Sequence, residues 1–227
     1  MIVNSGKGAV TAPHHLPGFA LSLTPAPDTV FKDVSGVVGC TSGDKVACVK
    51  DANNDNVIFL QDSYSARPTL EQVDDKYVLR FTQGCCLPCV VPVNKGTKCF
   101  GLVCSVSPDS QDGSVLQASE NACYLQPNND IYVRGALGTP HINISYPNHF
   151  LLQKSEAGSW EYRVGGQDVT INSNTYEWEG LYLGGVPYTH SADFDLYGLV
   201  VCYHVSHIYL TSLETYLGNI YNKVTDA

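Results

Sequence analysis

Charged residues are scarce in this sequence. They make up 15% of its 227 residues, compared with roughly 25% in an average soluble domain. Acidic residues outnumber basic ones, with 22 Asp and Glu against 13 Lys and Arg, and the formal net charge is −9. A general nucleic-acid-binding protein needs a cationic surface that displaces counterions from phosphates. The composition therefore excludes this class, and the polar surface must consist mainly of Ser, Thr, Asn, Gln and Tyr.

Long apolar segments are also missing. No apolar run approaches the roughly 20 residues that a membrane-spanning helix needs, so membrane insertion is not expected. The first eight residues lack the basic start and the continuous apolar stretch of a signal peptide. Hydrophobic residues nevertheless make up 44% of the chain and aromatic residues 10%, which excludes a disordered protein. We expect a soluble globular protein that is made without a signal peptide.

Sequence signatures of catalysis are absent as well. The chain contains no Gly-x-Ser-x-Gly elbow, no phosphate-binding Gly-Lys-Ser/Thr loop and no dinucleotide-binding Gly-x-Gly-x-x-Gly fingerprint. His204 and His207 lie three positions apart, so on a continuous strand they face opposite sides and are poorly placed to bind one metal ion. The sequence therefore predicts no catalytic residue, no metal ligand and no cofactor.

Short runs of β-branched and aromatic residues recur along the chain, separated by turn residues such as Gly, Pro, Asn and Asp. Strands at this spacing, without helices between them, predict a mainly β protein that is either an antiparallel β-barrel or a β-sandwich. The predicted strands cover Val57–Gln61, Tyr77–Thr82, Cys89–Val93, Lys98–Val106, Ile131–Arg134, His149–Gln153, Trp160–Val164, Thr175–Leu183 and Leu199–His204.

The C-terminal segment is the one part with a clear helical pattern. Leu213, Leu217, Ile220 and Val224 recur at helical spacing. They predict one C-terminal helix whose apolar stripe covers one side of the β core.

The N-terminal segment is rich in proline, which removes backbone donors and favours extended conformations. This composition predicts an extended proline-rich arm over residues 1–30. No shift in composition divides the rest of the chain, so residues 31–227 are predicted to form a single β-rich globular domain.

The nine cysteines are an odd number, so at least one thiol cannot be paired within the chain. Most lie in apolar, strand-like contexts, which is typical of reduced thiols in a reducing compartment. Cys85, Cys86, Cys89, Cys99 and Cys104 form a cluster in the sequence. Cys86 and Cys89 have the spacing of a zinc knuckle, but no second knuckle follows. Packed thiols are the main interpretation, with a disulfide or redox pair and a structural zinc site as alternatives.

An acidic segment resembles a calcium-binding loop. Asp51 to Asp62 places oxygen-bearing side chains at the first, third, fifth and twelfth positions of that pattern. Asn56 stands where the sharp turn needs glycine, and Asp62 stands where a bidentate Glu is usual. An Asn- and Asp-rich hairpin turn is therefore the simpler interpretation.

Two pairs of carboxylates alternate with aromatic residues. Glu177 and Glu179 flank Trp178, and Asp193 and Asp195 flank Phe194, so on a strand each pair projects from one face. Glycoside hydrolysis uses two carboxylates across a cleft. A half-buried strand with a solvent-exposed face gives the same pattern.

Tyrosine is abundant, with 14 copies, and many lie beside Asn, Ser and Gly near predicted turns. Tyr combines a broad apolar area with a hydroxyl group at small entropic cost, as recognition surfaces require. The richest such stretch is Glu179–His190. We therefore predict that Tyr182, Tyr188 and His190 bind a ligand, with rings packed into the core as the alternative.

The low charge, the Tyr-, Asn-, Ser- and Thr-rich composition, the long turns and the N-terminal arm together are typical of a recognition domain. In these respects the chain resembles a projection or spike domain of a small RNA-virus capsid, and it is most similar in kind to an astrovirus capsid spike. The resemblance extends loosely over the whole chain. It implies a homodimer on the virion surface, made in the host cytoplasm. Such a spike attaches to host cells through a receptor or glycan and is recognised by antibodies.

The residues leave two other functions open. A β-sandwich carbohydrate-active hydrolase would use one of the carboxylate pairs in an aromatic-lined cleft. A zinc-stabilised binding module would use the cysteine cluster. The main prediction is a non-enzymatic surface recognition domain.

Overall fold

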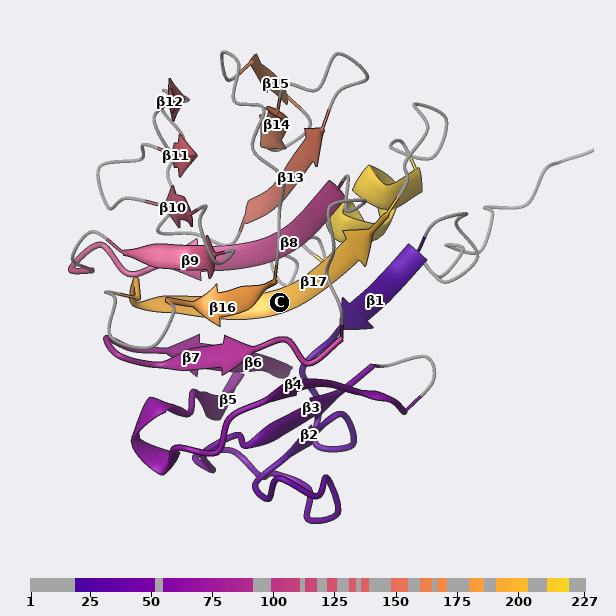
Figure 1. The fold of residues 1–227 in the computed structure, drawn as a ribbon, viewed down its shortest axis with the longest axis vertical. Coiled ribbons are helices and arrows are strands. Elements are labelled where there is room, and N and C mark those ends of the chain that lie inside the picture. Colours follow the sequence, from indigo (N-terminus) through magenta and orange to yellow (C-terminus); the bar gives the residue numbers. More distant parts are fainter. Residues whose placement is uncertain are drawn as a thin grey trace, which may run out of the picture.

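The computed structural model describes residues 19–51, 55–91, 99–110, 113–117, 122–125, 131–133, 136–138, 148–154, 160–164, 167–170, 180–185, 191–203 and 212–220. Within these ranges the chain is mainly β, every pair of neighbouring strands is antiparallel, and the sheets do not close into a barrel (Figure 1). One helix covers residues 212–220. The predicted fold class is confirmed, and of its two forms the structure adopts the β-sandwich.

The largest sheet has eight strands in the order β15-β14-β13-β8-β17-β6-β5, with β1 also paired to β17. Its strands are β1 (Phe19–Leu23), β5 (Thr69–Val73), β6 (Lys76–Phe81), β8 (Cys99–Val106), β13 (Asn148–Lys154), β14 (Trp160–Val164), β15 (Gln167–Thr170) and β17 (Phe194–Cys202). The central pair is β8 and β17, and both are almost completely buried. We refer to this layer as the large sheet.

The opposite layer consists of two smaller sheets. The six-stranded sheet has the order β12-β11-β10-β9-β16-β7, and the three-stranded sheet has the order β2-β3-β4. Their strands are β2 (Val30–Phe31), β3 (Cys48–Lys50), β4 (Val57–Leu60), β7 (Cys86–Pro88), β9 (Ser114–Gln117), β10 (Ala122–Leu125), β11 (Ile131–Val133), β12 (Ala136–Gly138) and β16 (Tyr182–Gly184). A bridge between Phe59 and Cys89 joins the two sheets edge to edge.

Strand β17 separates two hydrophobic cores. The main core lies between the large sheet and the two smaller sheets, and the second core lies on the other face of the large sheet. A register shift between Leu196 and Gly198 changes the alternation of side chains along the strand. β17 contributes Phe194, Leu196, Leu199 and Val201 to the main core and Tyr197, Val200 and Cys202 to the second core.

The helix over residues 212–220 covers the second core, beside the end of β17 (Figure 1). Leu213 and Leu217 are fully buried against the sheet, and Ile220 packs at the edge of this core. Glu214 also forms an ion pair with Arg163 of β14, with the guanidinium nitrogen 2.8 Å from the carboxylate oxygen. The predicted covering helix is therefore confirmed, while Val224 lies outside the described residues. No helix in the described ranges is both long and apolar enough to span a membrane.

Most of the predicted strands occur close to their expected positions, including those that became β4, β6, β8, β11, β13 and β14. The predicted strand Cys89–Val93 is wrong over its described residues 89–91, because β7 ends at Pro88 and Cys89 makes only an isolated bridge. Of the predicted Thr175–Leu183 strand, only Tyr182 and Leu183 are strand residues among those described, and Gly180 adopts a positive φ of 75°. β17 begins at Phe194, five residues before the predicted start at Leu199.

Part of the predicted arm over residues 1–30 belongs to the large sheet. Residues 1–18 lie outside the described residues, whereas Phe19–Leu23 forms β1 and pairs with Leu199–Cys202 of β17. Leu21, Leu23 and Val30 are buried in the main core. Prolines do not prevent this strand, since none lies within it and Pro25 and Pro27 follow its end.

The cysteine cluster does not form the four-thiolate site of the zinc alternative. Cys104 lies in the main core and Cys99 in the second core, so these two thiols of β8 face opposite sides of the large sheet. Among the described residues there is no group of metal-ligating side chains that could hold an ion. The eight cysteines whose side chains the structure describes are free thiols, as the main interpretation predicted. Burial raises the pKa of the Cys40 thiol to about 12 and that of Cys89 to about 11.

The segment of calcium-loop spacing forms a β-hairpin instead. β3 and β4 pair on either side of it, and Asp55 takes a positive φ of 59° in the turn. Asp51 is buried, and its carboxylate accepts a hydrogen bond from the Ser22 backbone N–H at 3.0 Å. Residues 52–54 lie outside the described residues. The carboxylate of Asp51 thus ties the hairpin to β1, which is a structural role.

Candidate functional site

A groove lies where β6, β8 and β17 meet at one end of the large sheet. Its volume is about 410 Å³. The residues that line it come from the end of β6, the end of β8 with the turn that follows, and the start of β17: Arg80, Phe81, Thr82, Ser105, Val106, Ser107, Pro108, Asp193, Phe194 and Asp195. We call it the Arg80–Asp195 groove.

An ion pair between Arg80 and Asp195 is the main polar feature of this groove. Antiparallel pairing places Asp195 of β17 directly opposite Arg80 of β6. The guanidinium Nε and Nη2 donate to the two carboxylate oxygens, each at 2.8 Å. The hydrogen bond to Asp195 raises the pKa of Arg80. The Arg80 side chain is 43% exposed and that of Asp195 18%. A fixed, charged fork is therefore presented to solvent.

Hydroxyl groups surround the ion pair. Ser105 of β8 lies directly opposite Asp195 on the other side of β17. Thr82 follows the end of β6 and is exposed, and Ser107 lies in the turn after β8. Tyr197 follows Asp195 by two residues, and burial raises the pKa of its hydroxyl. A hydrogen bond with Ser105 partly offsets this rise by lowering the pKa. Pro108 is exposed and adds an apolar ring to the groove lining.

The start of β17 is held rigidly. The Ser191 hydroxyl accepts a hydrogen bond from the Gly84 N–H and donates one to the Thr82 carbonyl, both at 2.9 Å. The Asp193 N–H donates to the Ser110 hydroxyl at 2.8 Å. Behind the ion pair, the rings of Phe81 and Phe194 stack with centroids 4.4 Å apart and an angle of 3° between their planes. The polar groups of the groove are thus preorganised by the fold.

Asp193 brings a second carboxylate to the groove. In the described part of the chain, its Oδ1 is shielded from solvent and accepts no hydrogen bond. An unsatisfied buried acceptor is destabilising and favours a partner that donates a hydrogen bond to it. Asp193 precedes β17, so the predicted alternation with Asp195 along a strand is not what brings the two carboxylates together. Both carboxylates line the groove because they flank Phe194, the first residue of β17.

Of the other predicted site residues, only Tyr182 lies in the described part of the chain, and it does not line this groove. Tyr182 lies in β16, partly buried, opposite Pro88 on one side and Gln117 on the other. Tyr188, His190, Glu177 and Glu179 lie outside the described residues. The ligand-binding role of Tyr182, Tyr188 and His190 stays a prediction.

Sequence reasoning missed Arg80 and Ser105. Neither belongs to a sequence motif. Each residue is placed opposite Asp195 only by the register in which its strand pairs with β17. The one available signal was the alternation Asp193–Phe194–Asp195.

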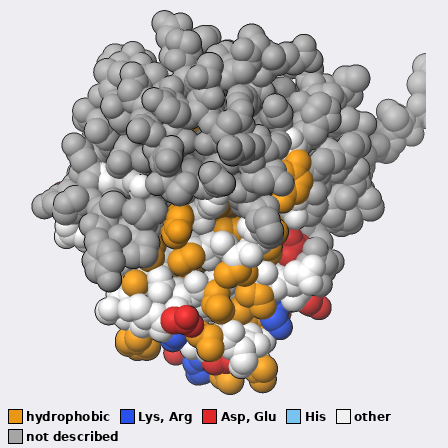
Figure 2. All heavy atoms as spheres, in the orientation of Figure 1, with side chains coloured by type: hydrophobic (Ala, Val, Ile, Leu, Met, Phe, Trp, Pro, Cys, Tyr) orange, Lys and Arg blue, Asp and Glu red, His pale blue; other side chains and the backbone are white. Residues whose placement is uncertain are grey.

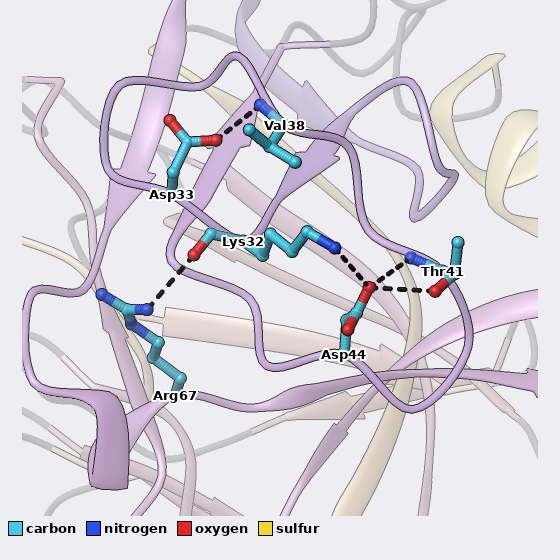
Figure 3. Close-up of polar contacts among 6 residues, drawn as sticks. All are labelled: Lys32, Asp33, Val38, Thr41, Asp44 and Arg67. Atoms are coloured by element: carbon cyan, nitrogen blue, oxygen red, sulfur yellow. Dashed lines mark hydrogen bonds and ion pairs between the residues drawn. The ribbon is translucent and has the colours of Figure 1, made fainter.

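A second set of polar contacts shapes the loop between Lys32 and Asp44 (Figure 3). The Asp33 carboxylate accepts hydrogen bonds from the Ser35 hydroxyl and from the N–H groups of Val37 and Val38. The Ser35 contact is the largest of several that lower the pKa of Asp33 to about 2. Asp44 accepts hydrogen bonds from the Thr41 N–H and hydroxyl, both at 2.9 Å, and these lower its pKa.

This loop exposes apolar side chains. Val34, Val37 and Val38 are 45%, 76% and 47% exposed. Figure 2 shows the face of the molecule seen in Figure 1, where hydrophobic side chains gather on the described part with a few charged side chains among them. The loop is a second surface at which contact with another molecule would remove apolar area from water.

Comparison with known proteins identifies relatives in fold only. No family model matches the sequence, and no curated protein matches it. A solved arabinofuranosidase complexed with arabinofuranosyl-alpha-1,2-xylobiose is similar over 78% of this chain and 51% of that chain, with a TM-score of 0.54 and 14% identity.

Two sialidase structures are also similar. A Trypanosoma rangeli sialidase with the inhibitor DANA matches 80% of this chain and 32% of that chain, with a TM-score of 0.50 and 13% identity. A Ruminococcus gnavus IT-sialidase CBM40 matches 60% of this chain and 95% of that chain, with a TM-score of 0.41 and 8% identity. This chain therefore spans about half of the arabinofuranosidase and about a third of the Trypanosoma sialidase. The likeness to these two structures establishes a shared β-rich fold.

Proposed function

We propose that this protein is a non-enzymatic recognition domain that binds a glycan in the Arg80–Asp195 groove. The observation that carries the proposal is the bidentate ion pair fixed at the groove, with both bonds at 2.8 Å. Binding pockets orient their ligands through a few precisely placed polar groups. Here the strand register and the stacked phenylalanines hold those groups in place.

The chemistry of the groove suits vicinal hydroxyl groups. A sugar hydroxyl both donates and accepts hydrogen bonds, and neighbouring hydroxyls lie a fixed distance apart. The guanidinium supplies donors and the carboxylates supply acceptors, while Ser and Thr hydroxyls can do either. Asp193 lines the same groove and adds a second carboxylate to the acceptors there. The exposed ring of Pro108 offers an apolar surface for the C–H groups of the sugar.

The fold comparison supports the choice of ligand class to test first. Its arabinofuranosidase neighbour was solved with a bound oligosaccharide. The likeness covers 51% of that chain and supports a carbohydrate panel as the first test. The groove residues carry the argument for a glycan site here.

Glycan binding can be measured by NMR titration of the labelled chain against a panel of neutral and acidic oligosaccharides. We expect resonances of groove residues such as Thr82 and Ser105 to shift. Arg80→Lys keeps the charge but removes the planar fork, and Asp195→Asn keeps the shape but removes the charge, so each should weaken binding by tenfold or more. Asp75→Asn is the matched control, since Asp75 forms an ion pair with Lys76 outside the groove.

Two results would oppose the proposal. Binding that survives both groove substitutions would place the site elsewhere, with the sequence segment that contains Tyr188 and His190 as the next candidate. If the folded chain binds no oligosaccharide of the panel, the proposed glycan-binding function is wrong.

A second candidate function is glycoside hydrolysis, because the groove holds two carboxylates. The ion pair argues against it. Both oxygens of Asp195 accept hydrogen bonds from Arg80, so neither is poised to donate a proton to a leaving group. Release of sugar from an aryl arabinoside or sialoside, abolished by Asp193→Asn and by Asp195→Asn, would favour the hydrolase.

The recognition domain is further proposed to be a homodimeric projection on a virion, where it would contact a host receptor and antibodies. The exposed valines of the Lys32–Asp44 loop offer apolar area for self-association. Light scattering across a micromolar dilution series tests this proposal. A dimer that persists on dilution and becomes monomeric in the Val37→Asp variant supports it, and a monomer throughout opposes it.

A further inference from the structure

Two cysteines face each other across the central strands of the large sheet. Cys99 is the first residue of β8 and Cys202 is the last residue of β17, and the antiparallel register pairs them directly. Both side chains belong to the second core, so they lie on the same face of the sheet. Both are free thiols, 0% and 1% exposed.

The register satisfies the backbone requirement of a disulfide. Directly opposed residues in an antiparallel pair have Cα atoms about 4.5 or 5.5 Å apart, depending on the type of pair. Disulfides span Cα separations of about 4.4–6.8 Å, so either type of pair lies within reach. No other two described cysteines are paired in this way by the strand registers.

We propose that Cys99 and Cys202 are the site of a cross-strand disulfide that locks β8 to β17. The oxidant is a small disulfide of the glutathione class. A thiolate of one cysteine attacks it, forms a mixed disulfide and releases one reduced thiol. The second cysteine then attacks the mixed disulfide, forms the Cys99–Cys202 bond and releases the second reduced thiol. Two protein thiols are oxidised and one small disulfide is reduced.

The C-terminal helix controls access to this pair. Leu213 and Leu217 of the helix belong to the same buried core as both thiols. A Cβ on Gly101, two residues from Cys99, would lie 2.7 Å from Leu217 Cδ1, so the helix lies close against this part of β8. Burial raises the pKa of the Cys202 thiol to about 12 and that of Cys99 well above its usual value. Oxidation therefore requires the helix to lift, because the docked helix excludes both water and oxidant.

The test uses the whole reduced chain with excess oxidised glutathione. After acid quenching and alkylation, peptide mapping without reductant should identify Cys99 linked to Cys202. Glu214→Gln removes the charge that pairs the helix with Arg163 and should speed the reaction several-fold. The oxidised chain should melt roughly 5 °C or more above the reduced chain, because the bond closes a long loop of the unfolded state.

Matched variants separate this pair from the other thiols. Cys99→Ala and Cys202→Ala should each abolish the new crosslink. Cys104→Ala should leave it intact, since Cys104 lies on β8 but faces the main core opposite Leu196. The proposal is overturned if Cys99 or Cys202 links to a different cysteine in the wild-type map. It is also overturned if both thiols stay reduced in Glu214→Gln after the other cysteines have reacted. Neither result bears on glycan binding.

Discussion

Gly101 lies directly beneath Leu217, and a side-chain Cβ at this position would come within 2.7 Å of Leu217 Cδ1. Gly198 has a similar relationship to Ile220, at 2.9 Å. Both glycines lie on the central strands of the large sheet, where they let the C-terminal helix approach. This close approach gives the first prediction.

Gly101→Ala should destabilise the protein by about 1–3 kcal/mol, because the added methyl group overpacks the second core. The measurement is urea unfolding followed by fluorescence. Gly218→Ala is the control, since Gly218 lies in the same helix and a Cβ there meets no atom within 4 Å. That substitution should stabilise by about 0.5–1 kcal/mol through helix propensity. Equal stability of the Gly101→Ala variant and wild type would mean that the helix sits farther from β8.

The loop held by Asp33 should respond to acid. Asp33 has its pKa lowered from 3.8 to about 2, so the folded loop prefers the carboxylate. The stabilisation is present above pH 3.8 and is lost as the pH falls through about 2. The amide resonance of Val38, which donates to this carboxylate, should titrate with a midpoint near pH 2. Asp33→Asn should remove this titration, and a wild-type midpoint near 3.8 would contradict the hydrogen-bonded loop.

His149 should make the protein less stable in mild acid. It lies on β13 opposite Val103, half-buried, and desolvation lowers its pKa from 6.5. The unfolded chain therefore binds the proton more readily, and stability falls as the pH drops below about 6.5 towards the lowered value. Urea midpoints at pH 7.5, 6.5 and 5.5 should decline in wild type and change less in His149→Gln. If the urea midpoints of wild type and His149→Gln decline equally, the loss of stability in acid is due to titratable groups other than His149.

The sequence supported the local features of the fold better than the long-range ones. β14 was predicted with its bounds, and the helix was predicted from the spacing of Leu213 and Leu217, because each pattern is complete within a few residues. β1 was missed because its five residues lie among prolines, and it is stabilised by β17, from the other end of the chain.

The groove could not be derived from the sequence for the same reason. Arg80 and Asp195 are 115 positions apart, and their contact depends on the register of β6 against β17. A shift of one residue would turn one side chain to the opposite face. The start of β17 was also concealed, since the bulge at Gly198 interrupts the alternation that identifies a strand. Only the carboxylates of Asp193 and Asp195 were recognisable in advance.

The pairing of β1 with β17 has a consequence for how the protein is made. Phe19 leaves the ribosome long before Cys202, its partner in the register. The large sheet therefore cannot be completed until β17 has been synthesised, and contacts of such long sequence separation form slowly. During this interval the apolar residues of β1, Leu21 and Leu23, lack the neighbours that bury them in the finished fold. Completion of the large sheet is thus expected to follow the synthesis of β17, and β1 stays without its sheet partner until then.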